Sequence, residues 1–150
     1  MESVDLTASP RIFLLDKEPY CLYLYEQIMG NLGYHNVHSF NRSADCLNQL
    51  TQKPDIIFVD YDMDNLGGIE VLKKIKRFDP GIIVFFISEQ AAIGLAISAL
   101  EYGALDYITK QDISKEKIRY CLDRGTMMRL VSGIAVPTFM SFPERLFCKN

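Results

Sequence analysis

The sequence predicts an α/β fold: a doubly wound sheet of five parallel strands with helices on both faces. Strand-like and helix-like patterns alternate five times along the 150 residues, which is the order that builds a parallel sheet. The apolar run at Ile56–Val59 contains no polar residue, as expected of a strand buried on both faces. A chain of this length can bury a sizeable core as one domain.

The strands are predicted where short apolar or β-branched runs follow turn signals. The segment Lys53–Asp55 precedes the third run, and the turn Asp79–Gly81 precedes the fourth. In chain order, the predicted strands are Ile12–Leu15, Val37–Phe40, Ile56–Asp60, Ile82–Ile87 and Leu105–Thr109.

Each strand is followed by a segment with helical signals. Pro19 can open the first helix, Ser43 can cap the second, and Asp112 or Ser114 can cap the last. In the third segment, apolar residues recur at helical spacing with lysines on the other face. The predicted helices run from Pro19 to about Met29, from Ser43 to about Gln52, from Ile69 to Lys76, from about Ala91 to Tyr102 and from Lys115 toward Leu130.

Residues 131–150 break the alternation, since they contain two prolines, three phenylalanines and no clear period. We expect an extended tail that docks on the surface or is poorly ordered, or else a specific binding segment. The predicted organisation is therefore an N-terminal extension at 1–10, one domain at 11–130 and a C-terminal tail at 131–150.

Composition excludes several classes of function. The chain is 49% hydrophobic and 23% charged, as in a soluble globular protein, and its net charge of −3 predicts no nucleic-acid surface. The N-terminus has no signal-peptide pattern, and the longest apolar stretch, Ala91–Leu100, is too short to span a membrane. The four cysteines lack metal-binding spacing, so we expect free thiols in the reducing cytoplasm.

Polar side chains stand at the carboxyl ends of four predicted strands. Asp16, Asp60, Ser88 and Lys110 each follow directly on an apolar run or close a strand. Ligands of open α/β sheets bind outside this edge, and an unpaired charge is costly to bury in a core. We therefore expect these four residues in one shallow cleft.

The residue types at this edge predict phosphoryl chemistry assisted by a cation. Asp16 and Asp60 are expected on adjacent strands, where two carboxylates attract a hard cation such as Mg²⁺. An aspartate can carry a phosphoryl group covalently, and its transfer requires positive charge on the phosphoryl oxygens. Lys110 can supply such a charge, and the Ser88 hydroxyl can donate a hydrogen bond.

Four segments carry these residues in a fixed order: IFLLDKEP, PDIIFVDYDMDNLGGIEVLKKIK, FFISEQ and GALDYITKQ. Together they resemble the receiver domain of bacterial two-component response regulators, over roughly residues 10–130. The resemblance implies that Asp60 is the phosphoacceptor and that Ser88, Lys110 and Tyr107 bind the phosphoryl group or switch on it. It also implies a flavodoxin-like sheet with strand order 2-1-3-4-5.

The resemblance further implies a cofactor and partners. Mg²⁺ would be held by Asp16, Asp60 and the backbone of Asp62, and the phosphoryl donor would be a sensor histidine kinase or a phosphotransfer protein. The switch would act through Ser88 and Tyr107 on the face made by the fourth helix, fifth strand and fifth helix. The chain would be a signalling module and not an enzyme.

Lys17 is the gravest departure from the family, whose members usually carry a second metal-binding acid at this position. Its ammonium could compete with Mg²⁺ for Asp16 and Asp60, because an ammonium about 4 Å from a carboxylate gains on the order of 4 kcal/mol at an effective dielectric near 20. Two further residues beside the pocket are atypical. Glu18 could compensate for the missing acid, as could Asp62 or Asp64, and Glu89 stands where a small residue normally leaves the site open.

Three functions follow from these observations. The first is a phosphorylation-controlled receiver, and the second is a pseudo-receiver, in which Lys17 replaces the metal and the domain binds partners without phosphorylation. A flavodoxin-fold enzyme or flavin carrier is disfavoured, because the loop after the first strand cannot cradle a phosphate and no nucleophile–base pair is evident.

The predicted fourth helix has no charged residue between Ala91 and Leu100. A helix that covers one face of a sheet normally presents charges to solvent, so an uncharged one predicts an interface. We expect its outer surface to be covered by the tail or by a second molecule, with a possible homodimer through the 91–130 face.

Overall fold

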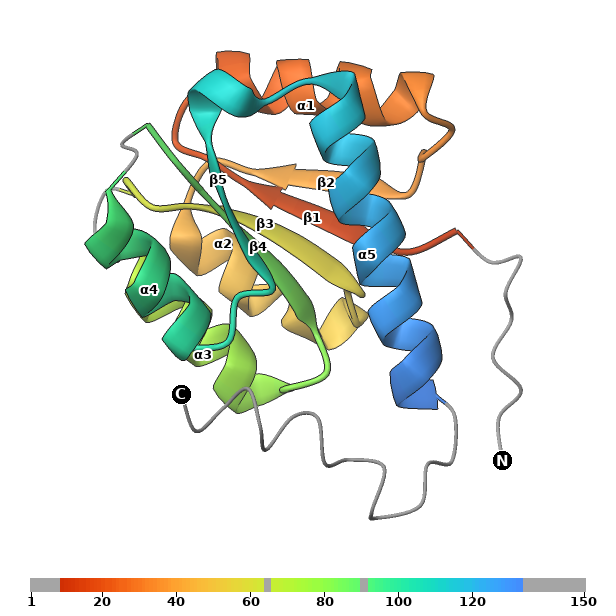
Figure 1. The fold of residues 1–150 in the computed structure, drawn as a ribbon. Coiled ribbons are helices and arrows are strands. Elements are labelled where there is room, and N and C mark those ends of the chain that lie inside the picture. The colour runs from red at the N-terminus through yellow and green to blue at the C-terminus, as the bar shows by residue number, and fades with distance from the viewer. Residues whose placement is uncertain (1–8, 64–65, 90–91, 134–150) are drawn as a thin grey trace.

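A computed structural model describes residues 9–63, 66–89 and 92–133 of the chain. Its strands form one five-stranded parallel sheet in the order β2-β1-β3-β4-β5, as Figure 1 shows. This confirms the predicted fold class and the flavodoxin-like strand order. The strands are β1 at Ile12–Leu15, β2 at Val37–Phe40, β3 at Ile56–Asp60, β4 at Ile83–Ser88 and β5 at Asp106–Thr109.

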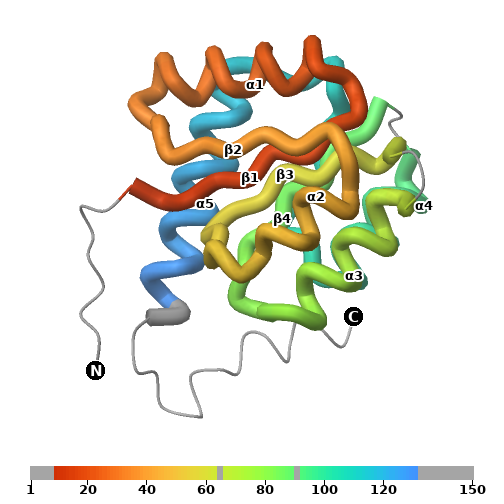
Figure 2. Tube along the Cα trace, turned by 180° about the vertical axis from the view of Figure 1, so that it is seen from behind, coloured from red at the N-terminus to blue at the C-terminus, as the bar shows by residue number. Residues whose placement is uncertain are grey.

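Helices cover both faces of the sheet. Two of them, α1 and α5, pack on one face, while α2, α3 and α4 pack on the other (Figures 1 and 2). They comprise α1 at Pro19–Asn31, α2 at Ser43–Asn48, α3 at Gly68–Phe78, α4 at Ile93–Glu101 and α5 at Lys115–Gly133, with short 3₁₀ turns at Leu50–Gln52 and Lys110–Asp112.

Alternate residues of each strand fill two separate cores. In β3, Ile57 and Val59 face α2, α3 and α4, whereas Ile56 and Phe58 face α1 and α5. Every residue of β1, β3 and β4 is buried, because these three strands have a neighbour on each side and a helix layer on each face. Polar side chains are therefore confined to the ends of these strands.

Strand register places the polar strand ends at one edge of the sheet. Leu15 pairs with Val59, so the next residues of these two strands, Asp16 and Asp60, leave the sheet at the same level. Asp60 pairs in turn with Ile87, and Ser88 pairs with Thr109. The carboxyl edge thus collects the ends of all four strands that the sequence pointed to.

Two details of the helices differ from the prediction. The Ser43 side chain does not cap α2, which begins after Arg42; its hydroxyl instead donates to the Leu66 carbonyl at 3.2 Å. The second difference is that α5 continues to Gly133. Residues 131–133, which were predicted to begin the tail, therefore belong to the helix. Its remaining residues, 134–150, lie outside the described part of the chain.

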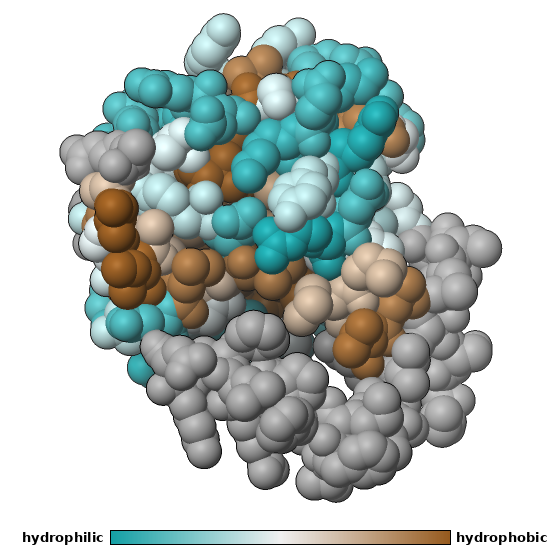
Figure 3. All heavy atoms as spheres, viewed as in Figure 1, coloured by the Kyte–Doolittle hydropathy of each residue, from teal (hydrophilic) through white to brown (hydrophobic). Residues whose placement is uncertain are grey.

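The outer face of α4 is apolar, as its sequence predicts. Ile93, Ile97 and Leu100 are 79%, 50% and 49% exposed, and hydrophobic atoms are visible along this helix at the left of Figure 3. Ala99 alone among the residues of α4 is fully buried. The pairing of two copies through this face stays a prediction.

Neither a membrane span nor a disulfide is found within the described residues. No helix there is both long and apolar enough to cross a bilayer. Cys21, Cys46 and Cys121 are free thiols, as expected, and Cys148 lies outside the described part of the chain.

Gly68 begins α3 where the chain has no room for a side chain. A Cβ atom at this position would lie 2.5 Å from the Asp60 carbonyl oxygen and 2.7 Å from the Tyr61 Cα, and both are backbone atoms. The Gly68 N–H also donates to the Tyr61 carbonyl at 3.0 Å. Glycine therefore lets α3 start directly against the strand end that carries Asp60.

We expect Gly68→Ala to lower the free energy of unfolding by about 1–3 kcal/mol, because the backbone must shift to admit a methyl group. Gly67→Ala is the matched control, since nothing lies within 4 Å of a Cβ there and its φ of −60° suits any residue. Urea unfolding of both variants and the wild type measures the effect. Equal stabilities for the two variants would contradict the close approach at Gly68.

Candidate functional site

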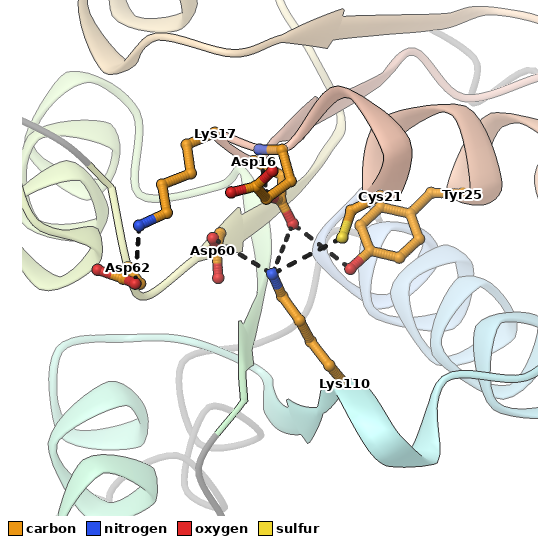
Figure 4. Close-up of polar contacts among 8 residues, drawn as sticks. Asp16, Lys17, Cys21, Tyr25, Asp60, Asp62 and Lys110 are labelled. Atoms are coloured by element: carbon orange, nitrogen blue, oxygen red, sulfur yellow. Dashed lines mark hydrogen bonds and ion pairs between the residues drawn. The ribbon is translucent and has the colours of Figure 1, made fainter.

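Asp16, Asp60 and Lys110 form a buried ionic cluster at the carboxyl edge of the sheet (Figure 4). The Lys110 Nζ lies 3.1 Å from Asp16 Oδ2 and 3.6 Å from Asp60 Oδ2. Asp16 is completely buried and Asp60 is 1% exposed. Lys110 begins the 3₁₀ turn after β5, and its long side chain reaches past the end of β4 to the two carboxylates.

Asp16 is held by groups from its own loop and from α1. The Glu18 backbone N–H donates to Asp16 Oδ1 at 2.8 Å, a turn that Pro19 allows because it fixes the start of α1. The Tyr25 hydroxyl donates to Asp16 Oδ2 at 3.5 Å, the oxygen that also contacts Lys110. Asp16 is therefore a well-partnered anion despite its burial.

Lys110 stays cationic in this environment. Burial lowers its pKa, but the hydrogen bond with Asp16 and the charges of Asp60 and Asp16 outweigh burial, so the pKa of Lys110 is raised above its ordinary value. The Cys21 thiol lies 3.9 Å from its Nζ. Burial and the nearby Asp16 charge raise the pKa of Cys21, so Cys21 lines the site as a neutral thiol.

Asp60 is the poorly satisfied member of the cluster. Neither of its buried carboxylate oxygens has a well-formed hydrogen bond among the described residues. Burial and the charge of Asp16 raise the pKa of Asp60, and this outweighs the opposing effects of Lys110 and of the nearby Asp62 backbone N–H. The charge of the Asp60 carboxylate is thus only partly compensated, by the ion pair with Lys110, and Asp60 can use a cation or a phosphoryl group as a further partner.

Lys17 turns away from this cluster toward Asp62, as Figure 4 shows. Its Nζ lies 2.9 Å from Asp62 Oδ2, and the two side chains are 32% and 72% exposed. Lys110 contacts Asp16 and Asp60, and the competition of Lys17 with Mg²⁺ for these carboxylates stays a prediction. The Lys17 side chain lies at the rim of the site, on the side of the cluster opposite Cys21 and Tyr25.

The other predicted residues lie around the same edge at different depths. Ser88 is buried at the end of β4, while the Glu18 and Glu89 side chains are exposed. Tyr107 is half-buried on β5, with its ring stacked on Phe86 at 6.2 Å between centroids. The functional roles of these residues stay predictions.

Two neighbouring carboxylates suit a hard cation, which usually keeps several waters. Asp16 and Asp60 come from adjacent strands, and the Asp60 oxygens accept no well-formed hydrogen bond among the described residues, although Oδ2 pairs with Lys110. Across the described residues, no group of three or more His, Cys, Asp or Glu side chains is arranged to hold a metal ion. The acidic pair therefore fits Mg²⁺ only with water and backbone oxygen as the remaining ligands.

Sequence reasoning did not identify Tyr25 and Cys21 as neighbours of the site. Both belong to α1, one turn apart, in the helix that Pro19 starts at the sheet edge. Their spacing of four residues after an acidic strand end was the available signal, since it puts them on one helix face.

Comparison with known proteins identifies similar sequences and folds. The family model for the response regulator receiver domain matches residues 12–122. The transcriptional regulatory protein CssR of Bacillus subtilis is 31% identical over 107 residues, which are 71% of this chain and 47% of CssR. The chemotaxis protein CheY of Thermotoga maritima is 25% identical over 101 residues, which are 67% of this chain and 84% of CheY.

ZraR of Klebsiella oxytoca, also a transcriptional regulatory protein, is 31% identical over 100 residues. The chain spans 47% of the length of CssR and 22% of that of ZraR. Among solved structures, a CheY-like receiver domain from Methanospirillum hungatei superposes with a TM-score of 0.77 at 20% identity, covering 84% of this chain and all of that one. The NtrX receiver domain of Brucella abortus superposes with a TM-score of 0.72 at 25% identity, covering 77% of this chain and 98% of that one.

The incomplete compensation of the Asp60 charge predicts that removing this charge stabilises the fold. We expect Asp60→Asn to raise the free energy of unfolding by about 1–2 kcal/mol at pH 8 in metal-free buffer, because one ammonium then faces one carboxylate. The folded-state pKa of Asp60 is raised, so wild-type stability falls as pH rises through it. The stability gained by Asp60→Asn is therefore largest at pH values above that pKa. It disappears as the pH falls toward the pKa of an unfolded aspartate.

Thermal and urea unfolding across the pH range measure this difference, with Asp123→Asn as the matched control because Asp123 is exposed on α5. The control should stay within about 0.5 kcal/mol of the wild type at every pH. An Asp60→Asn variant no more stable than the wild type at pH 8 would show that the Asp60 charge is already compensated.

Proposed function

This chain belongs to the response regulator receiver family of two-component signalling, and we propose that it is a switch that accepts a phosphoryl group on Asp60. The observation that carries this proposal is the state of the Asp60 carboxylate. It is buried at the sheet edge without a well-formed hydrogen bond among the described residues, beside a lysine that is itself held by Asp16. A nucleophile placed next to a fixed cation suits phosphoryl transfer.

In the proposed reaction, an Asp60 carboxylate oxygen attacks the phosphorus of a phosphohistidine on a sensor histidine kinase or a phosphotransfer protein. The new P–O bond makes an acyl phosphate, the P–N bond breaks, and the histidine leaves with the electron pair of that bond and takes up a proton. Lys110 can leave Asp60 Oδ2 and follow the transferred oxygens, since its long stem is flexible. Asp16 keeps the lysine within reach.

Mg²⁺ is the cofactor that this proposal requires, and Asp16, Asp60 and the backbone of Asp62 would hold it. When bound, it neutralises charge on the transferring phosphoryl oxygens. The residues of the chain do the rest: Asp16 orients Lys110, burial excludes bulk water from Asp60, and the Ser88 hydroxyl donates to a phosphoryl oxygen.

The phosphoryl group would be sensed by Ser88 and Tyr107. Tyr107 stacks on Phe86, the β4 residue two positions before Ser88, so a movement of the β4 end reaches the β5 aromatic through direct packing. The surface that receives this change lies on α4, where Ile93 and Ile97 are exposed. We assign partner binding to this face.

A specific observation favours a second function, a pseudo-receiver that binds partners without phosphorylation. Lys110 already bridges Asp16 and Asp60, and Lys17 neutralises Asp62 at the rim. Two lysines thus oppose three carboxylates without any metal. In this alternative, that internal neutralisation holds the domain in one permanent state.

Phosphorylation is tested by intact mass after incubation of the folded chain with acetyl phosphate and Mg²⁺. We expect the wild type to gain one phosphoryl group and Asp60→Ala to gain none, because the attacking carboxylate is then absent. Asp123→Ala removes an exposed aspartate elsewhere and should label like the wild type. A wild type that stays unlabelled would overturn the proposal and favour the pseudo-receiver.

The role of Lys17 is tested by titrating Mg²⁺ into the wild type, Lys17→Met and Lys17→Asp. Removing the ammonium frees Asp62, and adding a carboxylate supplies a further oxygen ligand. We expect affinity to rise in the order wild type, Lys17→Met, Lys17→Asp, by roughly tenfold or more in total, which is about 1.4 kcal/mol. Equal affinities for all three proteins would make Lys17 a bystander.

A further inference from the structure

The strand β2 leaves one edge of the sheet open. Within the described residues, it has β1 on one side and no strand on the other (Figure 2). The carbonyls of Asn36 and Phe40 accept hydrogen bonds from backbone N–H groups in and just after β1, at 2.9 and 3.2 Å. Because the direction of the backbone groups alternates along a strand, the N–H and C=O groups of Val37 and Ser39 point to the open edge.

The sequence of β2 lacks the usual obstacles to pairing with another chain. Edge strands are commonly protected by a lysine, a proline or a bulge. The segment Val37–Phe40 contains neither lysine nor proline, and its register with β1 runs without interruption. Each of its residues is at least partly exposed. The backbone of β2 can therefore accept a further strand.

A groove of about 650 Å³ runs along this edge between α1 and α2, so another chain has room to approach. The groove is built by a stretch that the structure describes without a gap, residues 9–63. Its lining comprises Glu26 from α1, then Val37, His38, Ser39 and Phe40 from β2, and Asp45, Asn48, Gln49 and Gln52 from α2 and the turn after it.

Two exposed carboxylates flank the groove, one on each face of the sheet. Glu26 stands on α1, on the side of Ser39, whose hydroxyl donates to Glu26 Oε1. Asp45 stands in the first turn of α2, on the side of Phe40, which packs against the core beneath α2. Neither carboxylate has an ion-pair partner in the described chain. A strand added at this edge places successive side chains on alternate faces, so it can present a cation to each carboxylate.

We propose that the β2 edge binds an extended basic segment of a partner protein, which joins the sheet as a further strand. The backbone of this segment pairs with Val37 and Ser39, and basic side chains on its two faces meet Glu26 and Asp45. A second copy of this chain fits less well, because pairing β2 with its own copy across a two-fold axis brings like charges together. The β2 edge lies at the opposite end of the strand order from β5, so it is separate from the face assigned to α4.

NMR titration of the full chain with a short capped peptide, Ser-Lys-Val-Ile-Lys-Ser, tests this proposal. The two lysines of the peptide face opposite sides when it is extended. We expect saturable shifts centred on Val37 and Ser39. With the peptide at about ten times its Kd, hydrogen exchange of both amides should slow by roughly tenfold. The same peptide with N-methylated central amides keeps its charge but cannot donate to β2, so its affinity should fall by roughly tenfold or more.

A pair of double variants tests the charge complementarity. Glu26→Gln/Asp45→Asn should weaken peptide binding by roughly three- to tenfold, because exposed ion pairs are individually weak. Glu116→Gln/Asp123→Asn removes the same charge from exposed positions of α5, and it should leave the affinity unchanged.

Several results would each overturn the proposal. They are absence of saturable binding, equal affinity of the N-methylated peptide, equal loss in both double variants, and slowed exchange confined to other surfaces. A chain that dimerises without peptide and thereby protects the amides of Val37 and Ser39 would assign the edge to a second copy instead. Because binding is measured without phosphorylation, these outcomes are independent of whether Asp60 accepts a phosphoryl group.

Discussion

One ammonium serves two buried carboxylates at the sheet edge, and the chemistry of the site depends on this imbalance. Lys110 lies closer to Asp16 than to Asp60, and Asp16 has two further hydrogen-bond donors. The missing compensation therefore falls on Asp60, whose pKa burial and the Asp16 charge raise. A buried charge of this kind costs stability. It also makes Asp60 the group in the cluster that most gains from a cation or from conversion to an acyl phosphate.

The fold makes this imbalance possible by leaving no other place for the charges. β1, β3 and β4 are buried along their whole length, so Asp16 and Asp60 stand at the first positions where polar groups can meet solvent or ligand. Gly68 then brings the start of α3 against the Asp60 carbonyl. This close approach packs the start of α3 against the backbone at the strand end that carries Asp60.

The sequence was sufficient for features that follow from burial alone. Apolar runs ended by Asp16, Asp60, Ser88 and Lys110 predicted both the strands and their shared edge, because parallel strands align their carboxyl ends. Features that depend on side-chain direction were less accessible. The four-carbon stem of Lys17 allows several partners, and the contact of Ser43 with Leu66 depends on how two distant loops pack. Tyr25 joins the site through the orientation of α1, which periodicity does not specify.

The position of Lys17 bears on the choice between the two functions. Its ion pair with Asp62 joins side chains that are 32% and 72% exposed, and exposed pairs contribute only about 0–1 kcal/mol. A divalent ion can displace so weak an interaction. Lys110 is the stronger competitor of a metal ion for Asp16 and Asp60. In the proposed phosphorylated state, however, the same ammonium would pass from the Asp60 carboxylate to a phosphoryl oxygen. The pseudo-receiver requires both lysines to act as permanent substitutes for the metal. Of the two, Lys110 is the more buried, and it is also the residue that the proposed phosphoryl transfer needs.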